Sequence, residues 1–405
     1  MEPTSGLLLV VLFAGAAGLG WLFARYSANR KPMPAARVSA EYFQGLNFLL
    51  NEEPDKALEV FMRMVDVDAD TVDTHFALGS LFRRRGETER AIRIHQNLVA
   101  RPDLPKSERA RALNELAEDY LKAGLFDRAE QIFGQLASGG TLPAQGYRGL
   151  VRIYELEREW EKAIAAMDQL AALSRGEGSN VVAHYCCELA QEAIDRGDYV
   201  AARHWLKRAR NADPAGVRGA LLRATVAQRE GDQNLAIRLF DRALERDGGF
   251  IPDVLPQLRH SYGELGKPEV FQKKLEESLA KHPEWRPGVA FSAIVDGRFD
   301  DPVTRRCVAD FVTSNPILTD ILETLRPTLQ EGGADEAVRR ISRGLRRIAQ
   351  ASPRYRCSVC GFSGNVLYWQ CPSCRSWDTT RPVTRFRFEA MLEPRALPDE
   401  SRAKR

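Results

Sequence analysis

The stretch GSLFRRRGETERA, residues 79 to 91, carries the pattern that decides the fold. A small residue, Gly79, is followed after seven positions by a turn glycine, Gly86, and after five more by Ala91. A glycine in this place ends one helix, and the small side chains on either side let two helices approach closely. The same skeleton recurs at an interval of 34 residues, which separates Gly45 from Gly79 and Ala57 from Ala91.

Further copies extend this pattern along the chain. The interval of 34 residues also separates Ala129 from Ala163 and Ala202 from Ala236. Turn glycines stand five residues before most of these alanines, at Gly86, Gly124, Gly197 and Gly231. Large apolar side chains follow four residues after most of them, at Phe61, Phe133, Met167, Leu206 and Phe240, with His95 as the polar exception. A period of 34 with these features resembles the tetratricopeptide repeat.

The resemblance predicts an all-α superhelical solenoid. Each helix pair leaves an apolar face that only the next pair can bury, so the repeats share one continuous core. Six copies are recognisable, at residues 40–73, 74–105, 107–140, 144–177, 182–215 and 217–250. Beyond them the pattern slips, although Tyr262, Gly266, Phe271 and Pro283 keep its order. The later prolines predict shorter, less regular helices, and residues 332–348 resemble a final turn and second helix.

A solenoid of this kind performs no chemistry by itself. Its first helices form a long surface that suits a peptide or protein segment, so we expect a binding platform. The alternative for any single residue on that surface is an ordinary solvated side chain. Mapped onto the repeat skeleton, the groove positions of the family correspond to Asp73, Arg83, Arg111, Asn114, Arg148, Arg152, Gln191, Thr225 and Gln228.

Near the end of the chain, residues 357 to 377 read CSVCGFSGNVLYWQCPSCRSW. Two CxxC turns separated by ten residues place four thiolates around one point, which predicts a metal site. The ligands are Cys357, Cys360, Cys371 and Cys374. Four thiolates hold either zinc or a single iron, and the sequence does not choose between them. A redox-active CxxC pair is the less favoured alternative. Aromatic residues of this segment are interpreted as its apolar body: Phe362, Tyr368, Trp369 and Trp377.

The sequence shows no motif for catalysis or for nucleic-acid binding. With all four metal positions closed, no ligand position is open for a substrate or an activated water. The sequence contains no HExxH, Walker loop, GxGxxG or GxSxG motif, so we expect no enzyme. A formal charge of +3 gives no reason to expect nucleic-acid binding. The remaining cysteines, Cys186, Cys187 and Cys307, are interpreted as packing residues.

The amino-terminal run GLLLVVLFAGAAGLGWLFA, residues 6 to 24, has no charged side chain and as a helix nearly spans a hydrocarbon core of about 30 Å. A cleaved signal peptide would carry its positive charge before this run. Here the cations follow it, at Arg25, Arg30, Lys31 and Arg37. This order favours a permanent single-pass anchor with the N-terminus outside and the bulk of the chain in the cytoplasm.

The predicted layout is therefore an anchor at residues 1–25, a basic linker at 26–39, the solenoid at 40–350, a metal ribbon at 351–393 and a disordered tail at 394–405. Within it, residues 334–350 form an amphipathic basic helix with five arginines. That helix either is the exposed face of the last repeat or meets anionic lipid or an acidic partner. The repeat periodicity favours the first interpretation.

An anchor, tetratricopeptide repeats and a rubredoxin-like ribbon from Tyr355 to Trp377 together resemble the lipopolysaccharide assembly protein B family of Gram-negative bacteria, along essentially the whole chain. The resemblance implies an adaptor of the inner membrane, with its N-terminus in the periplasm. Family members help the membrane AAA+ protease FtsH degrade the deacetylase LpxC, and a further inner-membrane regulator opposes them. The metal cysteines would then be structural, with the ribbon packed on the repeats. Arg375, where rubredoxin has glycine, weakens any inference of electron transfer. Whether the solenoids form a homodimer stays open.

Overall fold

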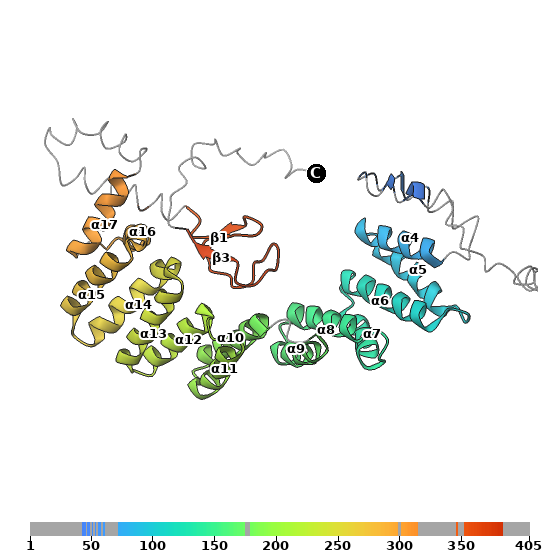
Figure 1. The fold of residues 1–405 in the computed structure, drawn as a ribbon, viewed down its shortest axis with the longest axis horizontal. Coiled ribbons are helices and arrows are strands. Elements are labelled where there is room, and N and C mark those ends of the chain that lie inside the picture. The colour runs from blue at the N-terminus through green and yellow to red at the C-terminus, as the bar shows by residue number, and fades with distance from the viewer. Residues whose placement is uncertain are drawn as a thin grey trace, which may run out of the picture. The chain divides into compact units, whose positions relative to one another are not determined.

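The computed structural model describes residues 72–174, 179–298, 301–314 and 352–383, together with Arg346 and scattered positions between 43 and 60 (Figure 1). The chain divides into two compact units, Met1–Gly149 and Leu150–Arg405. Sequence expectations for residues 1–25, 26–39, 332–348 and 394–405 lie outside the described residues, apart from Arg346. Among the described helices, none combines the length and the apolar character that a membrane crossing requires.

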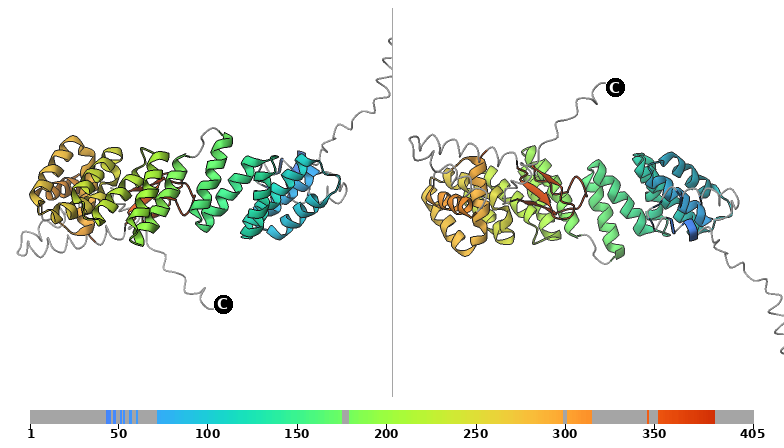
Figure 2. Two further views of the ribbon diagram at one scale, coloured as in Figure 1. Left: turned by 90° about the horizontal axis from the view of Figure 1, so that it is seen from below. Right: turned by 90° about the horizontal axis from the view of Figure 1, so that it is seen from above.

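Consecutive antiparallel helices make up the described part of the solenoid, as Figures 1 and 2 show. The first unit contains α4 (Val72–Arg84), α5 (Thr88–Ala100), α6 (Lys106–Lys122), α7 (Phe126–Ser138) and the start of α8 (Pro143–Glu157). The second unit continues with α9 (Trp160–Ser174), α10 (Ser179–Asp195), α11 (Tyr199–Ala212), α12 (Val217–Arg229), α13 (Gln233–Arg246), α14 (Ile251–Glu264), α15 (Pro268–Lys281), α16 (Arg286–Asp296) and α17 (Pro302–Thr313). Short 3-10 helices, η1 (Gly248–Phe250) and η2 (Pro283–Trp285), precede α14 and α16.

The repeat skeleton predicted from the sequence is confirmed. All four predicted turn glycines have a positive φ, from 76° to 86°, which is the left-handed region that favours glycine. The alanine five residues after each of them is fully buried. A Cβ added to Gly79 would lie 2.4 Å from the ring of His95, so the backbone of α4 lies directly against the α5 side chain. The close approach therefore depends on a residue without a side chain.

One repeat has no glycine at its turn. Arg158, between α8 and α9, occupies the position five residues before Ala163 and has a φ of 59°. A left-handed conformation costs a residue with a Cβ roughly 1 to 2 kcal/mol. The turn geometry therefore persists at this position despite an unfavourable residue, because the packing of the two helices requires it.

The region after residue 250 is more regular than the sequence indicates. Where slippage was expected, α14 and α15 form a complete hairpin with a left-handed glycine, Gly266, at its turn. The prediction of shorter helices is confirmed for α16 and α17, which have 11 and 12 residues. Each of them has a proline in its first turn, where the missing N–H costs no hydrogen bond.

The segment after residue 351 forms a small antiparallel sheet with strand order β2-β1-β3. Its strands are β1 (Tyr355–Cys357), β2 (Ser363–Gly364) and β3 (Thr380–Pro382). Cys357 pairs with Thr380, and Arg356 pairs with Ser363 on one side and Arg381 on the other. This three-stranded sheet and its two cysteine turns are named the ribbon.

Candidate metal centre and its docking on the repeats

The four predicted ligands come together in the ribbon. Sγ of Cys357 lies 3.7 Å from Sγ of Cys374, and Sγ of Cys360 lies 3.6 Å from Sγ of Cys371. All four sulfur atoms lie within 4.8 Å of one another. A tetrahedron with metal–sulfur bonds of about 2.3 Å has sulfur–sulfur edges of roughly 3.8 Å, so one ion fits among them. A disulfide would require a sulfur–sulfur distance of about 2.05 Å.

The two cysteine turns are built alike. In the first, Gly361 N–H donates to Cys357 C=O at 3.1 Å and Cys357 N–H donates to Phe362 C=O at 2.8 Å. In the second, Arg375 N–H donates to Cys371 C=O at 2.8 Å and Cys371 N–H donates to the carbonyl of the residue after Arg375 at 3.0 Å. Gly361 and Arg375 have φ values of 76° and 59°. The departure from glycine noted in the sequence therefore leaves the turn geometry intact.

Hydrogen bonds prepare two of the thiols for metal binding. The Thr379 hydroxyl, 3.3 Å from Cys357 Sγ, and the backbone N–H of Cys360 lower the pKa of Cys357 to about 6. Contacts with Ser376 likewise lower the pKa of Cys374. Burial raises the pKa of Cys371 to about 11, so this thiol depends on the ion itself for its deprotonation. All four positions of the tetrahedron are protein ligands, which is the arrangement of a structural site.

The ribbon is attached to the repeats by two tryptophans. The indole Nε1–H of Trp377 donates to Glu155 Oε1 at 2.9 Å, and the Tyr185 hydroxyl donates to the same oxygen at 2.7 Å. The Trp377 ring meets Tyr185 edge-on at 5.7 Å and Trp160 edge-on at 6.1 Å. Burial and the neighbouring Glu155 raise the pKa of Tyr185, which keeps its hydroxyl a donor.

His184 of α10 lies against both tryptophans. Its imidazole stacks on Trp377 at 5.1 Å and 20°, and lies 6.3 Å from the Trp369 ring. Trp369 also stacks on Phe250 at 5.4 Å, with the Arg218 guanidinium 5.6 Å from its ring. Burial, followed by the positive charge of Arg218, lowers the pKa of His184 to about 4. The imidazole at this contact is therefore neutral at pH 7.

Strand β1 and strand β3 add polar ties. The Tyr355 hydroxyl donates to Asp253 Oδ1, and the guanidinium of Arg381 forms an ion pair with Asp247 at 3.1 Å. Burial raises the pKa of Asp253. The ribbon thus contacts residues of α8, α10, α12 and α14, which are the first helices of four successive hairpins.

The predicted groove residues fall into three groups. Some are tied to neighbouring helices: Arg83 to Asp119 at 2.7 Å and Glu115 at 2.6 Å, Arg111 to Asp73 at 3.1 Å, and Gln228 to Ser261 at 2.9 Å. Others bond within their own helix, Gln191 to Asp195 and Thr225 to the Leu221 carbonyl. Arg148 and Arg152 are exposed and Asn114 is half-buried. Their role in partner binding stays a prediction.

Arg83 also belongs to a buried polar network. The only sign of this network in the sequence is His95, the polar exception to the repeat pattern. His95 and Asp119 are fully buried, and His95 Nδ1 lies 2.5 Å from Asp119 Oδ2. Arg83 bonds the other carboxylate oxygen of Asp119, so the three side chains join α4, α5 and α6. The polar residue in the second helix is compensated by the carboxylate of Asp119, to which Arg83 bonds in turn.

Sequence reasoning missed the docking residues on the repeats: Glu155, Trp160, His184, Tyr185, Arg218, Asp247, Phe250 and Asp253. It also misplaced the ribbon's aromatic residues. Trp369 and Trp377 do not fill the inside of the ribbon, because they pack on the repeats, and Tyr368 is 42% exposed. The available signal was size: a segment of about 30 residues has too little interior to bury two tryptophans, so a docking surface could have been inferred.

The fold and site define a class: a tetratricopeptide-repeat protein that carries a docked four-cysteine metal ribbon. Comparison with known families agrees, since residues 355–382 match the rubredoxin metal binding domain, and residues 74–108 and 114–177 match tetratricopeptide repeats. Lipopolysaccharide assembly protein B of Escherichia coli strain K12 is 33% identical over 93% of this chain and 98% of its own length. The Haemophilus influenzae protein of the same name is 29% identical over the same shares. The chain belongs to the lipopolysaccharide assembly protein B family.

Proposed function

We propose that this chain is an adaptor of the bacterial inner membrane that regulates lipopolysaccharide synthesis by delivering the deacetylase LpxC to the membrane protease FtsH. The observation that carries the proposal is the similarity to lipopolysaccharide assembly protein B over 93% of the chain. It extends through the repeats, which suit protein binding, and the ribbon, whose closed metal site suits structure rather than catalysis.

The apolar run at residues 6–24 supports the membrane part of the proposal. A single-pass anchor with a cytoplasmic solenoid would hold a soluble client beside a membrane protease and raise its effective concentration there. The same location brings the solenoid within reach of an opposing inner-membrane regulator. In this arrangement the partners are proteins, and nucleic acid has no role.

The test is the half-life of LpxC in a Gram-negative host that lacks its own family member. The full chain should shorten that half-life several-fold, and a version without residues 1–31 should fold and still bind the deacetylase but shorten its half-life much less. The effect should vanish when FtsH is inactivated. Full regulation by the anchorless version would contradict the tether, and an unchanged half-life with the full chain would contradict the adaptor function.

A further inference from the structure

The hairpin of α14 and α15 breaks the rule that the other hairpins follow. In the hairpins built around Gly86, Gly124, Gly197 and Gly231, a glycine or alanine stands seven residues before the turn glycine and an alanine stands five residues after it. Around Gly266 these two positions hold Arg259 and Phe271. The Arg259 guanidinium lies 5.8 Å from the Phe271 ring, so a large pair occupies the crossing where the other hairpins have two small residues.

The large pair opens a space beside the crossing. Helices α14 and α15 contact each other less than α10 and α11 or α12 and α13 do. A cavity of about 170 Å³ lies among α13, α14, α15 and η2. We name it the wedge pocket; its lining is Asp241, Leu244, Glu245, Ile251, Leu258, Tyr262, Phe271, Lys274, Leu275, Ser278, Lys281, His282 and Trp285.

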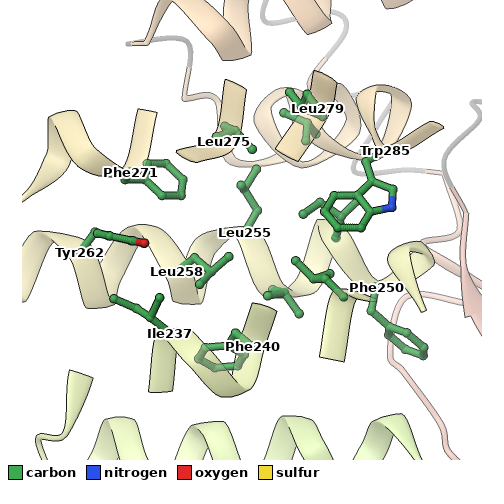
Figure 3. Close-up of a cluster of buried hydrophobic side chains, with 14 of the residues drawn as sticks. Ile237, Phe240, Phe250, Leu255, Leu258, Tyr262, Phe271, Leu275, Leu279 and Trp285 are labelled. Atoms are coloured by element: carbon green, nitrogen blue, oxygen red, sulfur yellow. The ribbon is translucent and has the colours of Figure 1, made fainter. Parts of the chain in front are cut away.

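The side of the wedge pocket formed by facing residues of α14 and α15 is apolar, and polar or charged side chains line the rest. Figure 3 shows Phe271 and Leu275 of α15 facing Leu258 and Tyr262 of α14, and all four are at most 7% exposed. Trp285, stacked on His282 at 4.4 Å, lies at one end. An apolar cavity of roughly 150 Å³ holds a benzene-sized group, so the volume of this pocket suits a group of that size. One aromatic ring or one large aliphatic side chain therefore matches the space.

The charges of the pocket carry no bias toward either sign. Lys274 is paired with Asp241. Lys281 and Glu245 are exposed, and neither forms an ion pair within the part of the chain that the structure describes. A lipid surface or a nucleic acid would call for an excess of cations, whereas one free cation and one free anion complement a protein segment of mixed charge.

We propose that the wedge pocket receives an aromatic or large aliphatic side chain of a partner protein. A free molecule of that size makes too few contacts for tight binding, whereas an anchor side chain gains the rest of its affinity from neighbouring residues of its own segment. The pocket is lined by α13, α14 and α15, while the predicted groove residues lie on the preceding first helices, so this is a second binding site. The inference rests on the proposed adaptor function only in that the occupant is a protein.

The first experiment tests the pocket itself, in the full chain. A 5-fluorotryptophan label at Trp285 reports on the cavity by ¹⁹F NMR, assigned with Trp285→Phe, and toluene is the probe. Toluene should shift this signal in a saturable way. Ser278→Phe, which places a ring in the cavity, should weaken toluene binding at least tenfold, whereas Ala280→Phe on the exposed face of α15 should not. No saturable shift in the unsubstituted chain, or an equal shift in Ser278→Phe, would overturn the pocket.

The second experiment identifies the occupant in cells. A benzophenone amino acid replaces Lys281, an exposed residue at the rim of the wedge pocket, or, as the matched control, Ala280, and the photoadducts are mapped by mass spectrometry. The proposal expects a protein adduct from position 281 only, attached at or beside an aromatic or large aliphatic residue, and it expects Ser278→Phe to abolish that adduct. A lipid adduct, adducts equal at both positions, or none would overturn it. Neither experiment measures LpxC turnover, so their failure and failure of the proposed function are separate results.

Discussion

The repeats and the ribbon reach a fixed structure by different means. Between residues 72 and 246 the hairpins of each unit bury alanines and large apolar side chains. In the ribbon, among residues 352–383, the only buried apolar side chains are Tyr355, Cys357 and Cys371. Its two tryptophans are used on the repeats instead. The stability of the ribbon therefore depends on a metal ion and on contact with the surface of the repeats. The repeats need neither the ion nor that contact to form their own core.

Removing a metal ligand should give the largest effect and should divide the two regions. Cys371→Ser should lower the metal content from one ion per chain to near zero and unfold the ribbon, because a structural ion contributes on the order of 10 kcal/mol to such a segment. The repeats should keep their helices. Metal analysis, circular dichroism at 222 nm and limited proteolysis of residues 352–383 would show this.

Cys307→Ala is the matched control, since Cys307 is a buried thiol of α17 that lies outside the metal cluster. It should leave the metal content unchanged. A proportional loss of helix signal in Cys371→Ser would mean that the repeats and the ribbon fold as one unit, and the contrast drawn between them would be wrong.

Truncating Trp377 should detach the ribbon from the repeats without releasing its metal ion. The indole contacts Tyr185, His184 and Trp160, and truncating a half-buried tryptophan in such a contact costs up to about 3 kcal/mol. Trp377→Ala should keep its ion and lose hydrogen-exchange protection around Tyr185. Tyr368→Ala, at a residue that is 42% exposed, should change both by little. Loss of the ion in Trp377→Ala would show that docking and metal binding are inseparable.

Acid should weaken the same contact. The folded pKa of His184, about 4, lies below its ordinary value of 6.5, so the neutral imidazole stabilises docking fully above pH 6.5. That contribution, up to about 3 kcal/mol, is lost progressively as the pH falls toward 4. Arg218 and Arg381 oppose protonation of His184, and Asp378 and Asp213 favour it. The measurement is tryptophan fluorescence of the docked state between pH 7 and pH 4.

The control for this titration is His184→Phe, which keeps a ring against Trp377 and removes the titrating group. Asp253 has a raised pKa, so its protonation works in the opposite direction, but it is present in both proteins and cancels in the comparison. The His184→Phe variant should show a flatter pH dependence. An identical profile in both proteins would assign the acid sensitivity to another group.

The smallest expected change in stability comes from replacing a left-handed arginine by glycine, once in the repeats and once in the ribbon. Arg158 in the repeats and Arg375 in the ribbon both have a φ of 59° at positions where the sibling turns have glycine. Arg158→Gly and Arg375→Gly relieve that strain but add chain entropy to the unfolded state, for a net gain of up to about 1 kcal/mol each. Thermal unfolding measures the first and metal-chelator resistance the second. Destabilisation by either glycine would show that the arginine side chain makes a compensating contact.

Local pattern was sufficient for most of the fold. The turn glycines and the buried alanines were predicted correctly because each depends only on the packing of one hairpin. The four metal ligands were predicted correctly because the CxxC spacing fixes their geometry. The size of the ribbon could have indicated that a docking surface exists, but its residues on the repeats could not be predicted, since Trp377 and Glu155 are 222 residues apart and no period links them. Phe271 was counted among the residues that keep the order of a slipping pattern, and its large side chain at a position where other hairpins have alanine was not recognised as a departure. A departure from the repeat pattern therefore does not mean that the hairpin is incomplete.

Hydrogen exchange of the full chain with and without its metal ion tests the central claim, that the ion keeps the ribbon docked as part of the surface of the repeats. Removing the ion should abolish protection in residues 352–383 and lower it around His184 and Tyr185 of α10 and Arg218 of α12, while α4 to α7 stay unchanged. Unchanged protection in α10 and α12 after metal removal would contradict the claim.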